Sequence, residues 1–247
     1  MIVVDNISKS HLGRPVLENV SIEIPEGTNL GLIGPGGAGK TLLLKIICGL
    51  VKPDSGKVTI GGIDVHKLGA TQLADLRFRI GMLFQNYALF DFMNVADNIA
   101  FPLRQEGTLG ELEIAERVKK ALHDISLSTI GNRFPNELSG GMKKRVSFAR
   151  AVIRQPPILF YDDPTAGLDP VISSKIFILL RTMQQERGTT AVTISHDIGG
   201  IKEICDFFAM IDRGQIIFHG NRDAIERCEI PLVMQFWRGF SDDDLDG

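Results

Sequence analysis

Short runs of apolar and β-branched residues, separated by turn residues, form the first part of the chain. Three such runs, MIVVDNI, VLENVSIEIPEG and TNLGLIG, have the composition of strands. The third run leads through glycines into KTLLLKIICGL, in which leucine and isoleucine recur at helical spacing. The pattern therefore predicts a strand, a glycine loop and a helix in direct succession.

The rest of the chain alternates predicted strands with predicted helices. Strands are expected at KVTIGG and GMLFQ, on either side of a helix over 70–78, and again at ILFYDD and TTAVTISH. Helical spacing dominates 94–155 and returns over 173–185. A final pair of apolar runs, joined at Arg213-Gly214, predicts a hairpin. This order predicts an α/β fold with a mostly parallel sheet, into which 94–155 inserts a helical subdomain.

The composition narrows the class of protein. The 247 residues suffice for one or two domains with a sizeable core, and 27 Lys and Arg against 30 Asp and Glu give a net charge of -3. This balance gives no electrostatic bias toward nucleic acid. No apolar run reaches the ~18 residues of a membrane span, the N-terminus lacks a secretion signal, and three distant cysteines suit a reducing compartment. We therefore expect a soluble intracellular protein that binds no nucleic acid.

The segment GPGGAGKT at 34–41 fits the pattern G-x-x-x-x-G-K-[ST] and lies between a predicted strand and a predicted helix. Glycines let consecutive backbone N–H groups point inward, and the following helix adds its positive N-terminal dipole. The ammonium of Lys40 reaches the β- and γ-phosphates, and Thr41 offers a hydroxyl to Mg²⁺. The alternative is a plain glycine turn. The residues predicted to bind the phosphates of a nucleotide are Gly34, Pro35, Gly36, Gly37, Ala38, Gly39, Lys40 and Thr41.

A second candidate for phosphate chemistry is ILFYDD, an apolar strand that ends in Asp162 and Asp163 before Pro164. A carboxylate at such a strand end can bind the magnesium of a nucleotide. The alternative is an Asp that caps the next turn, since Asp before Pro is common in turns. The glycine loop in the same chain favours the metal role for Asp162.

The segment LSGGMKKR at 138–145 decides the class of protein. It resembles the LSGGQ signature of the ATP-binding subunits of ABC transporters, and it lies between the glycine loop and the acidic strand as in that family. The resemblance covers nearly the whole chain. It implies an α/β P-loop NTPase fold, the ABC nucleotide-binding domain, with a RecA-like core, a helical subdomain at about 94–155 and an N-terminal antiparallel β region. The ATP-binding domain is expected over 1–227 and a C-terminal extension over 228–247.

The same resemblance implies roles for single residues. Gln85 in LFQN is similar to the Q-loop glutamine of the family, Asp162 to its Walker B aspartate, and His196 in TISHD to its switch histidine. Asp163 stands at the position of the general base, and Asp169 ends the D-loop sequence GLD. The residues that this resemblance marks as catalytic are Asp163, His196 and Gln85, those marked as magnesium ligands are Thr41, Gln85 and Asp162, and Asp169 is marked as ATP-binding.

Ser139, Gly140 and Gly141 open a predicted helix. A hydroxyl, bare backbone N–H groups and the helix dipole then form a second anion site. In the geometry of the family, one chain cannot fold this site onto its own glycine loop. The resemblance therefore implies a head-to-tail homodimer, in which each ATP lies between the glycine loop of one copy and the signature of the other.

Two positions depart from the usual pattern of the family. Asp163 replaces Glu, and its carboxylate is one methylene short of a position where a general base must come within about 2.6–3.2 Å of water. We expect either slow hydrolysis or a subunit that binds ATP and dimerises but barely turns over. His11 stands where an aromatic residue usually stacks on adenine, and imidazole presents less surface. Either His11 stacks on the base or Val16 makes that contact.

Three further segments, NVADNIAFPLR, FYDDPTAGLDP and VMQFWRG, most resemble the ATPase subunit of Mla and related MCE-type lipid transporters. That resemblance implies a peripheral subunit at the cytoplasmic face of the inner membrane, which works with a membrane permease and an MCE-domain protein to move phospholipid. The alternatives are an importer of amino acids or other small polar solutes, and a regulatory scaffold that binds nucleotide with little hydrolysis. A soluble ABC ATPase of DNA repair or translation is disfavoured, because the sequence has one ATP site and no heptad run.

Two apolar segments are candidates for contacts with partners. Residues 87–95 are interpreted both as subdomain core and as a partly exposed groove for a permease helix. At the C-terminus, Phe236, Trp237 and Phe240 either fray in solvent or reach a neighbouring subunit.

Overall fold

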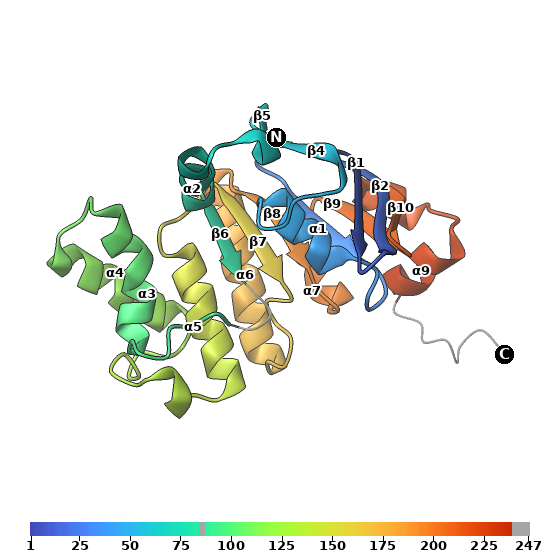
Figure 1. Ribbon diagram of the computed structural model, residues 1–247. Coiled ribbons are helices and arrows are strands. Elements are labelled where there is room, and N and C mark those ends of the chain that lie inside the picture. Colours follow the sequence, from blue (N-terminus) through green and yellow to red (C-terminus); the bar gives the residue numbers. More distant parts are fainter. Residues whose placement is uncertain (84–86, 239–247) are drawn as a thin grey trace.

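The computed structural model describes residues 1–83 and 87–238, which form two sheets covered by helices (Figure 1). The larger sheet has the strand order β10-β9-β3-β8-β7-β6, and the smaller one is antiparallel with the order β2-β1-β4-β5. In the larger sheet only β10 runs antiparallel to its neighbour. The strands are β1 Ile2–His11, β2 Arg14–Ile24, β3 Asn29–Ile33, β4 Ser55–Ile60, β5 Ile63–Asp64, β6 Ile80–Leu83, β7 Ile158–Asp162, β8 Thr190–Ile194, β9 Phe207–Asp212 and β10 Gln215–Asn221.

The larger sheet separates two hydrophobic cores. Strand β7 shows how, because successive side chains of a strand point to opposite faces. Leu159 and Tyr161 join the core that α5 and α6 share, while Ile158 and Phe160 join the core that holds α1 and the smaller sheet. The helices are α1 Lys40–Ile47, α2 Ala70–Phe78, α3 Val95–Glu106, α4 Glu111–Asp124, α5 Gly140–Val152, α6 Pro170–Arg187, α7 Ile198–Ile204, α8 Arg222–Glu226 and α9 Pro231–Arg238.

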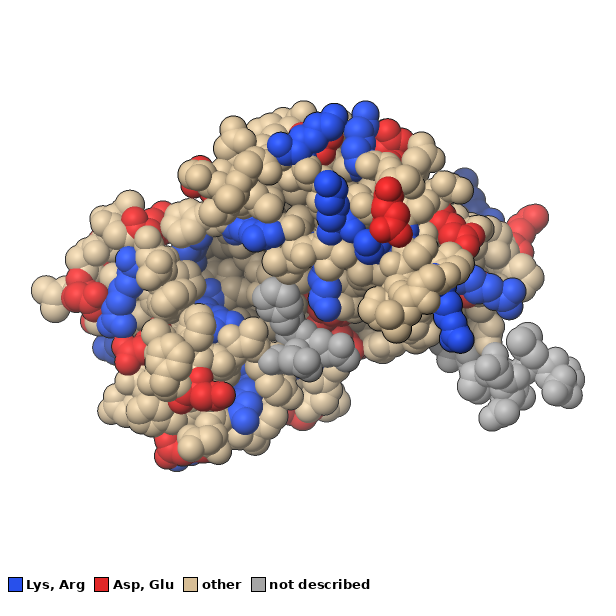
Figure 2. Space-filling view, in the orientation of Figure 1, with Lys and Arg blue, Asp and Glu red and all other residues tan. Residues whose placement is uncertain are grey.

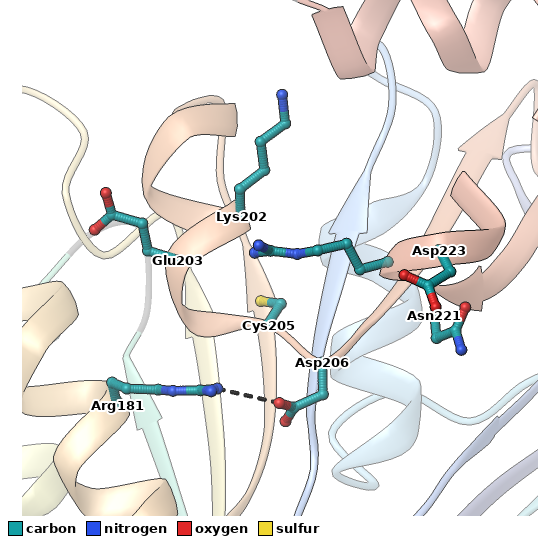
Figure 3. A pocket seen from close by; sticks show the side chains of 8 residues that line it. Arg181, Lys202, Glu203, Cys205, Asp206, Asn221 and Asp223 are labelled. Atoms are coloured by element: carbon teal, nitrogen blue, oxygen red, sulfur yellow. Dashed lines mark hydrogen bonds and ion pairs between the residues drawn. The ribbon is translucent and has the colours of Figure 1, made fainter. Parts of the chain in front are cut away.

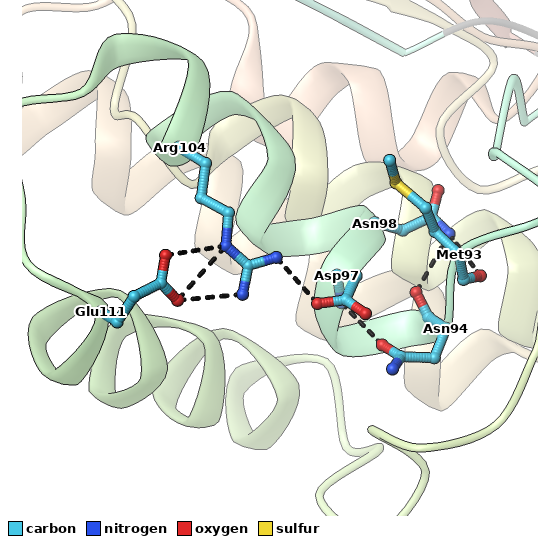
Figure 4. Close-up of polar contacts among 6 residues, drawn as sticks. All are labelled: Met93, Asn94, Asp97, Asn98, Arg104 and Glu111. Carbon is cyan, nitrogen blue, oxygen red and sulfur yellow. Dashed lines mark hydrogen bonds and ion pairs between the residues drawn. The ribbon is translucent and has the colours of Figure 1, made fainter.

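Helices α3, α4 and α5 form a lobe beside the sheets, at the left of Figure 1. Arg104 links α3 to α4 at the surface of this lobe, because its guanidinium contacts Asp97 on the same helix at 2.8 Å and Glu111 on α4 at 3.0 Å (Figure 4). Both pairs are exposed, so each contributes about 1 kcal/mol or less to stability. The predicted helical insertion therefore contains three helices over 95–152.

Most predicted elements are present, with shifted ends. The helix over 70–78 and the hairpin at Arg213-Gly214 have the expected bounds, and both turn residues have positive φ, 44° and 78°. The helix expected over 173–185 instead spans 170–187. Asp169 explains the earlier start, because its side chain accepts a hydrogen bond from the Ile172 N–H at 3.0 Å and caps the first turn.

The C-terminal helix α9 is part of this chain's own core. Trp237 is 6% exposed, and its ring meets Phe208 of β9 edge to face with centroids 4.8 Å apart. Lys202 of α7 lies 4.3 Å from the centre of the Trp237 ring and donates a hydrogen bond to the Trp237 carbonyl. The expectation that Trp237 frays or reaches a neighbouring subunit is therefore wrong, because its indole is buried against Phe208 of the same chain. Phe236 is half-buried beside the same core, and Phe240 lies outside the described residues.

Charged residues of both signs share the surface that Figure 2 shows. Figure 2 shows Lys and Arg interleaved with Asp and Glu over one face of the molecule, in keeping with the net charge of -3. None of the helices within 1–83 and 87–238 combines the length and the apolar character that crossing a membrane requires.

Candidate functional site

The glycine loop connects β3 to α1, and its backbone requires glycine at particular positions. Gly34 has φ 138°, and a Cβ there would lie 2.1 Å from the Ile211 carbonyl oxygen. Gly39 has φ 105° and precedes the first residue of α1, where no side chain of the described residues caps the helix. Backbone N–H groups at such a helix start attract anions. The loop therefore has the geometry of a phosphate site.

Lys40 is 7% exposed, and its ammonium lies across the loop that precedes it. Its Nζ donates hydrogen bonds to the carbonyl oxygens of Gly34 at 2.6 Å and Pro35 at 2.7 Å. Burial lowers the pKa of Lys40, and the negative charges of Asp162 and Asp163 act in the opposite direction. A positive charge is thus held between the glycine loop and the two carboxylates.

Asp162 and Thr41 come together at the ends of β7 and the glycine loop. The Thr41 hydroxyl donates to Asp162 Oδ2 at 2.9 Å, and Asp162 is 5% exposed. Burial raises the pKa of Asp162, the Thr41 hydrogen bond lowers it, and the charge of Asp163 raises it further. A carboxylate and a hydroxyl are the hard oxygen ligands that Mg²⁺ prefers, so the donor set fits the predicted metal.

Asp163 stands between this pair and His196. Its backbone has φ 58°, and its N–H donates to the Ile194 carbonyl at 2.9 Å. Its carboxylate accepts a hydrogen bond of 3.4 Å from the Ser195 hydroxyl and lies 4.0 Å from His196 Nε2. Ser195 was not predicted, although it directly precedes His196 in TISHD. The structure therefore places two predicted catalytic side chains side by side.

These groups surround one cavity of about 400 Å³. Val16 of β2 lines it, whereas His11 is exposed at the end of β1 and is not among its lining residues. The position of Val16 fits the interpretation in which Val16 contacts the base. The lining residues are Val16, Gly36, Gly37, Ala38, Gly39, Lys40, Thr41, Leu42, Asp162, Asp163, Ile194 and His196.

The signature residues do not line this cavity. Ser139 caps α5, since its Oγ accepts a hydrogen bond from the Met142 N–H at 3.3 Å, and Ser139 and Gly140 are exposed. A helix start with a free face of this kind can receive an anion. The site predicted from the signature is therefore separate, within one chain, from the site of the glycine loop. Gln85 lies outside the described residues, so its predicted role stays a prediction.

The apolar segment 87–95 is held in place by a buried amide. The Asn98 side chain accepts a hydrogen bond from the Phe90 N–H at 2.9 Å and donates to the Phe90 carbonyl at 3.0 Å. It also donates to the Met93 carbonyl at 3.0 Å (Figure 4). Phe90 packs against Phe101 with ring centroids 4.8 Å apart, whereas Phe92 is 75% exposed. The segment thus has one packed side and one open side.

A separate cavity of about 500 Å³ lies between α6, α7 and α8 (Figure 3). Two of its charged residues form an ion pair, in which Arg181 Nη1 lies 3.1 Å from Asp206 Oδ1. Asp206 Oδ2 also accepts hydrogen bonds from the Asn29 N–H at 2.9 Å and from the Gln184 amide at 3.1 Å. These contacts connect α6 to β3 and to the residue before β9, so they stabilise the fold.

The comparisons with known proteins agree with the interpretation of the cavity at 34–41 as a nucleotide site. The family described as "ABC transporter" matches residues 17–166. The chain belongs to this family. A solved dimeric ATP-binding cassette, bound to ADP and Pi in a post-hydrolysis state, is 32% identical and superposes with a TM-score of 0.85, over 90% of this chain and 98% of that one. The predicted fold is confirmed, and the prediction of an ABC ATPase is confirmed at the level of the family.

Two groups of curated relatives are similar over most of the chain. A methionine import ATP-binding protein of Carboxydothermus hydrogenoformans is 41% identical over 223 residues, 89% of this chain. A probable ribonucleotide transport ATP-binding protein of Mycobacterium tuberculosis is 35% identical over 238 residues, 96% of this chain. The chain spans 66% of the length of each. Neither relative is named for lipid transport, so the more specific prediction of an Mla-type ATPase is not supported by them.

Proposed function

We propose that the chain is the ATP-hydrolysing motor subunit of a membrane transporter and works as a head-to-tail pair at the cytoplasmic face of the membrane. The observation that carries the proposal is the separation of Ser139 from the cavity at 34–41. Two half-sites in one chain become two complete sites when a second copy is turned end to end. The solved cassette with the same fold is itself dimeric.

The residues at this site have separate roles in ATP hydrolysis. The loop N–H groups and Lys40 hold the phosphates, and Asp162 with Thr41 would hold the metal, with Gln85 as the further ligand that the sequence predicts. Bound Mg²⁺ would neutralise charge on the triphosphate. Asp163 takes a proton from the attacking water, and His196, 4.0 Å from its carboxylate, orients that water.

Asp163 acts slowly in this role, because its side chain is one methylene shorter than Glu. The Ser195 hydroxyl fixes one carboxylate oxygen, and the other is turned toward His196. A displacement of about 1 Å from the ideal position costs on the order of a hundredfold in rate. We propose slow but real hydrolysis rather than a scaffold that binds nucleotide with little turnover.

The cargo that the relatives favour is a small polar solute, with an amino acid such as methionine first. The relatives named above are a methionine import protein and a probable ribonucleotide transport protein. In such a transporter the cargo site belongs to the permease, and this chain supplies the energy by hydrolysing ATP. The open side of segment 87–95, with Phe92 at its surface, receives a helix of the permease.

Phospholipid transfer is the second candidate. It is favoured by the resemblance of segments 94–104, 160–170 and 233–239 to the Mla-type ATPase. An MCE-domain partner belongs only to this candidate. Both candidates use the same ATP cycle and differ in the permease.

Cells that carry Lys40→Met in place of the native chain distinguish the two. We expect uptake of labelled methionine to fall to background, while phospholipid distribution between membranes stays normal, because ATP no longer drives the importer. Lys52→Met, an exposed lysine, is the matched control and retains uptake. Altered lipid distribution with normal uptake would favour the second candidate, and no change in either would contradict the motor role.

A further inference from the structure

Helix α5 carries Lys144, a lysine that is only 4% exposed. Its Nζ donates a hydrogen bond to the Ala166 carbonyl at 2.9 Å. Ala166 belongs to the loop 163–169, which connects β7 to α6 and begins with Asp163. The signature helix is therefore tied through one side chain to the loop that carries the proposed general base.

The charge of Lys144 faces the same two carboxylates as the charge of Lys40. Burial lowers the pKa of Lys144, and Asp163 opposes this more strongly than Asp162 does. For Lys40 the order of the two carboxylates is reversed. The ammonium of Lys40 and the ammonium of Lys144 therefore both interact electrostatically with this pair. The sequence did not indicate this, because Lys143 and Lys144 are adjacent and only burial separates their roles.

The loop 163–169 needs such support. Asp163 has φ 58°, a left-handed conformation that a residue other than glycine keeps only where its surroundings hold it. The two ends of the loop are well held, since the Asp163 N–H donates to the Ile194 carbonyl at 2.9 Å and the Leu168 N–H donates to the Thr165 carbonyl at 3.0 Å. At Ala166 the backbone bond is weaker, because its N–H donates to the Asp163 carbonyl at 3.4 Å. The bond from Lys144 is a charged one, and such bonds are stronger than neutral ones.

We propose that Lys144 is a positioning residue for ATP hydrolysis, which holds the loop 163–169 so that the Asp163 carboxylate stays at the cavity of the glycine loop. The inference rests on the proposed function, since Asp163 acts only on ATP bound at 34–41. Lys144 does not line that cavity. Its loss therefore lowers turnover and leaves the affinity for ATP unchanged.

Steady-state ATP hydrolysis by the purified full chain tests the proposal. Lys144→Met keeps the length of the side chain and removes the donor, and we expect kcat to fall about tenfold or more while KM for ATP stays within about twofold. Lys144→Arg restores a donor and recovers part of kcat. Lys120→Met, an exposed lysine of α4, is the matched control and keeps wild-type kcat.

An unchanged kcat in Lys144→Met would overturn the inference. So would a loss of kcat that comes with a lower Tm and is not recovered by Lys144→Arg, because that pattern describes a merely structural lysine. If Lys144→Met does not fold, Lys144→Gln is measured against the same expectations. A wild-type chain that binds no ATP would instead refute the proposed function, whereas wild-type turnover with an indifferent Lys144 refutes this inference alone.

Discussion

Lys40→Met is expected to raise the dissociation constant for ATP by at least about a hundredfold, the largest effect of any single substitution in the chain. The ammonium is buried, and it interacts electrostatically with both Asp162 and Asp163. Without it, three or four phosphate charges meet two carboxylates with no counter-charge on the loop. Charged hydrogen bonds in a buried site are each worth several kcal/mol when one partner is removed.

Isothermal titration calorimetry with ATP and magnesium measures this change. The variant is expected to stay folded, because methionine fills the volume of the lysine stem. Lys52→Met, the exposed lysine used above, is the matched control and binds ATP like the wild type. Wild-type affinity in Lys40→Met would mean that the nucleotide binds elsewhere.

Asp162→Asn is expected to lower single-turnover hydrolysis by at least about a hundredfold and at the same time to raise Tm. The rate falls because an amide is a poor magnesium ligand beside Thr41. The stability rises because burial holds the pKa of Asp162 above its value in the unfolded chain. Such a group contributes stability while it is protonated, and that contribution is lost as pH rises through the folded pKa.

The difference in Tm between Asp162→Asn and the wild type, in metal-free buffer, is therefore expected to grow as pH rises from acid toward neutral. At neutral pH, each 1 kcal/mol by which Asp162→Asn stabilises the folded chain is expected to raise Tm by about 2–4 °C, the scale for a chain of this size. Asp163→Glu at the next position is the comparison, and the longer side chain is expected to speed single-turnover hydrolysis. Equal rates would dismiss the idea that side-chain length limits turnover, and a lower Tm for Asp162→Asn at every pH would contradict the electrostatic account.

Much of the fold and of the ATP site follows from short patterns in the sequence. Gly34, Gly37 and Gly39 have positive φ, and an apolar strand that ends in Asp162 leaves its carboxylate at the carboxyl end of a parallel sheet. Both facts are local, so the pattern alone indicates them. The hairpin at Arg213-Gly214 is local in the same sense.

Features that depend on distant contacts could not be predicted. Trp237 has the same appearance in the sequence whether it is buried against Phe208 or exposed, and only the position of β9 decides. Asn98 looks like an ordinary helix residue, yet its amide holds the loop at Phe90. Lys144 lies between Lys143 and Arg145, and the sequence alone does not show which of these basic residues is buried. For Trp237 and Lys144 the deciding partner lies on a distant part of the chain that the sequence does not place, whereas the partners of Asn98 are close in sequence and belong to a loop whose conformation no local pattern indicates.

The account depends on two copies that share each ATP, and mixing two inactive variants tests this most directly. Lys40→Met removes the positive charge from the glycine loop. Ser139→Glu puts a negative charge at the start of α5, and this charge repels phosphate. Each variant alone is expected to show no ATP hydrolysis. An equal mixture is expected to recover up to about one quarter of wild-type activity, because half of the dimers are mixed and each mixed dimer has one intact site of two. No recovery in the mixture, or full activity of Ser139→Glu by itself, would contradict the shared site.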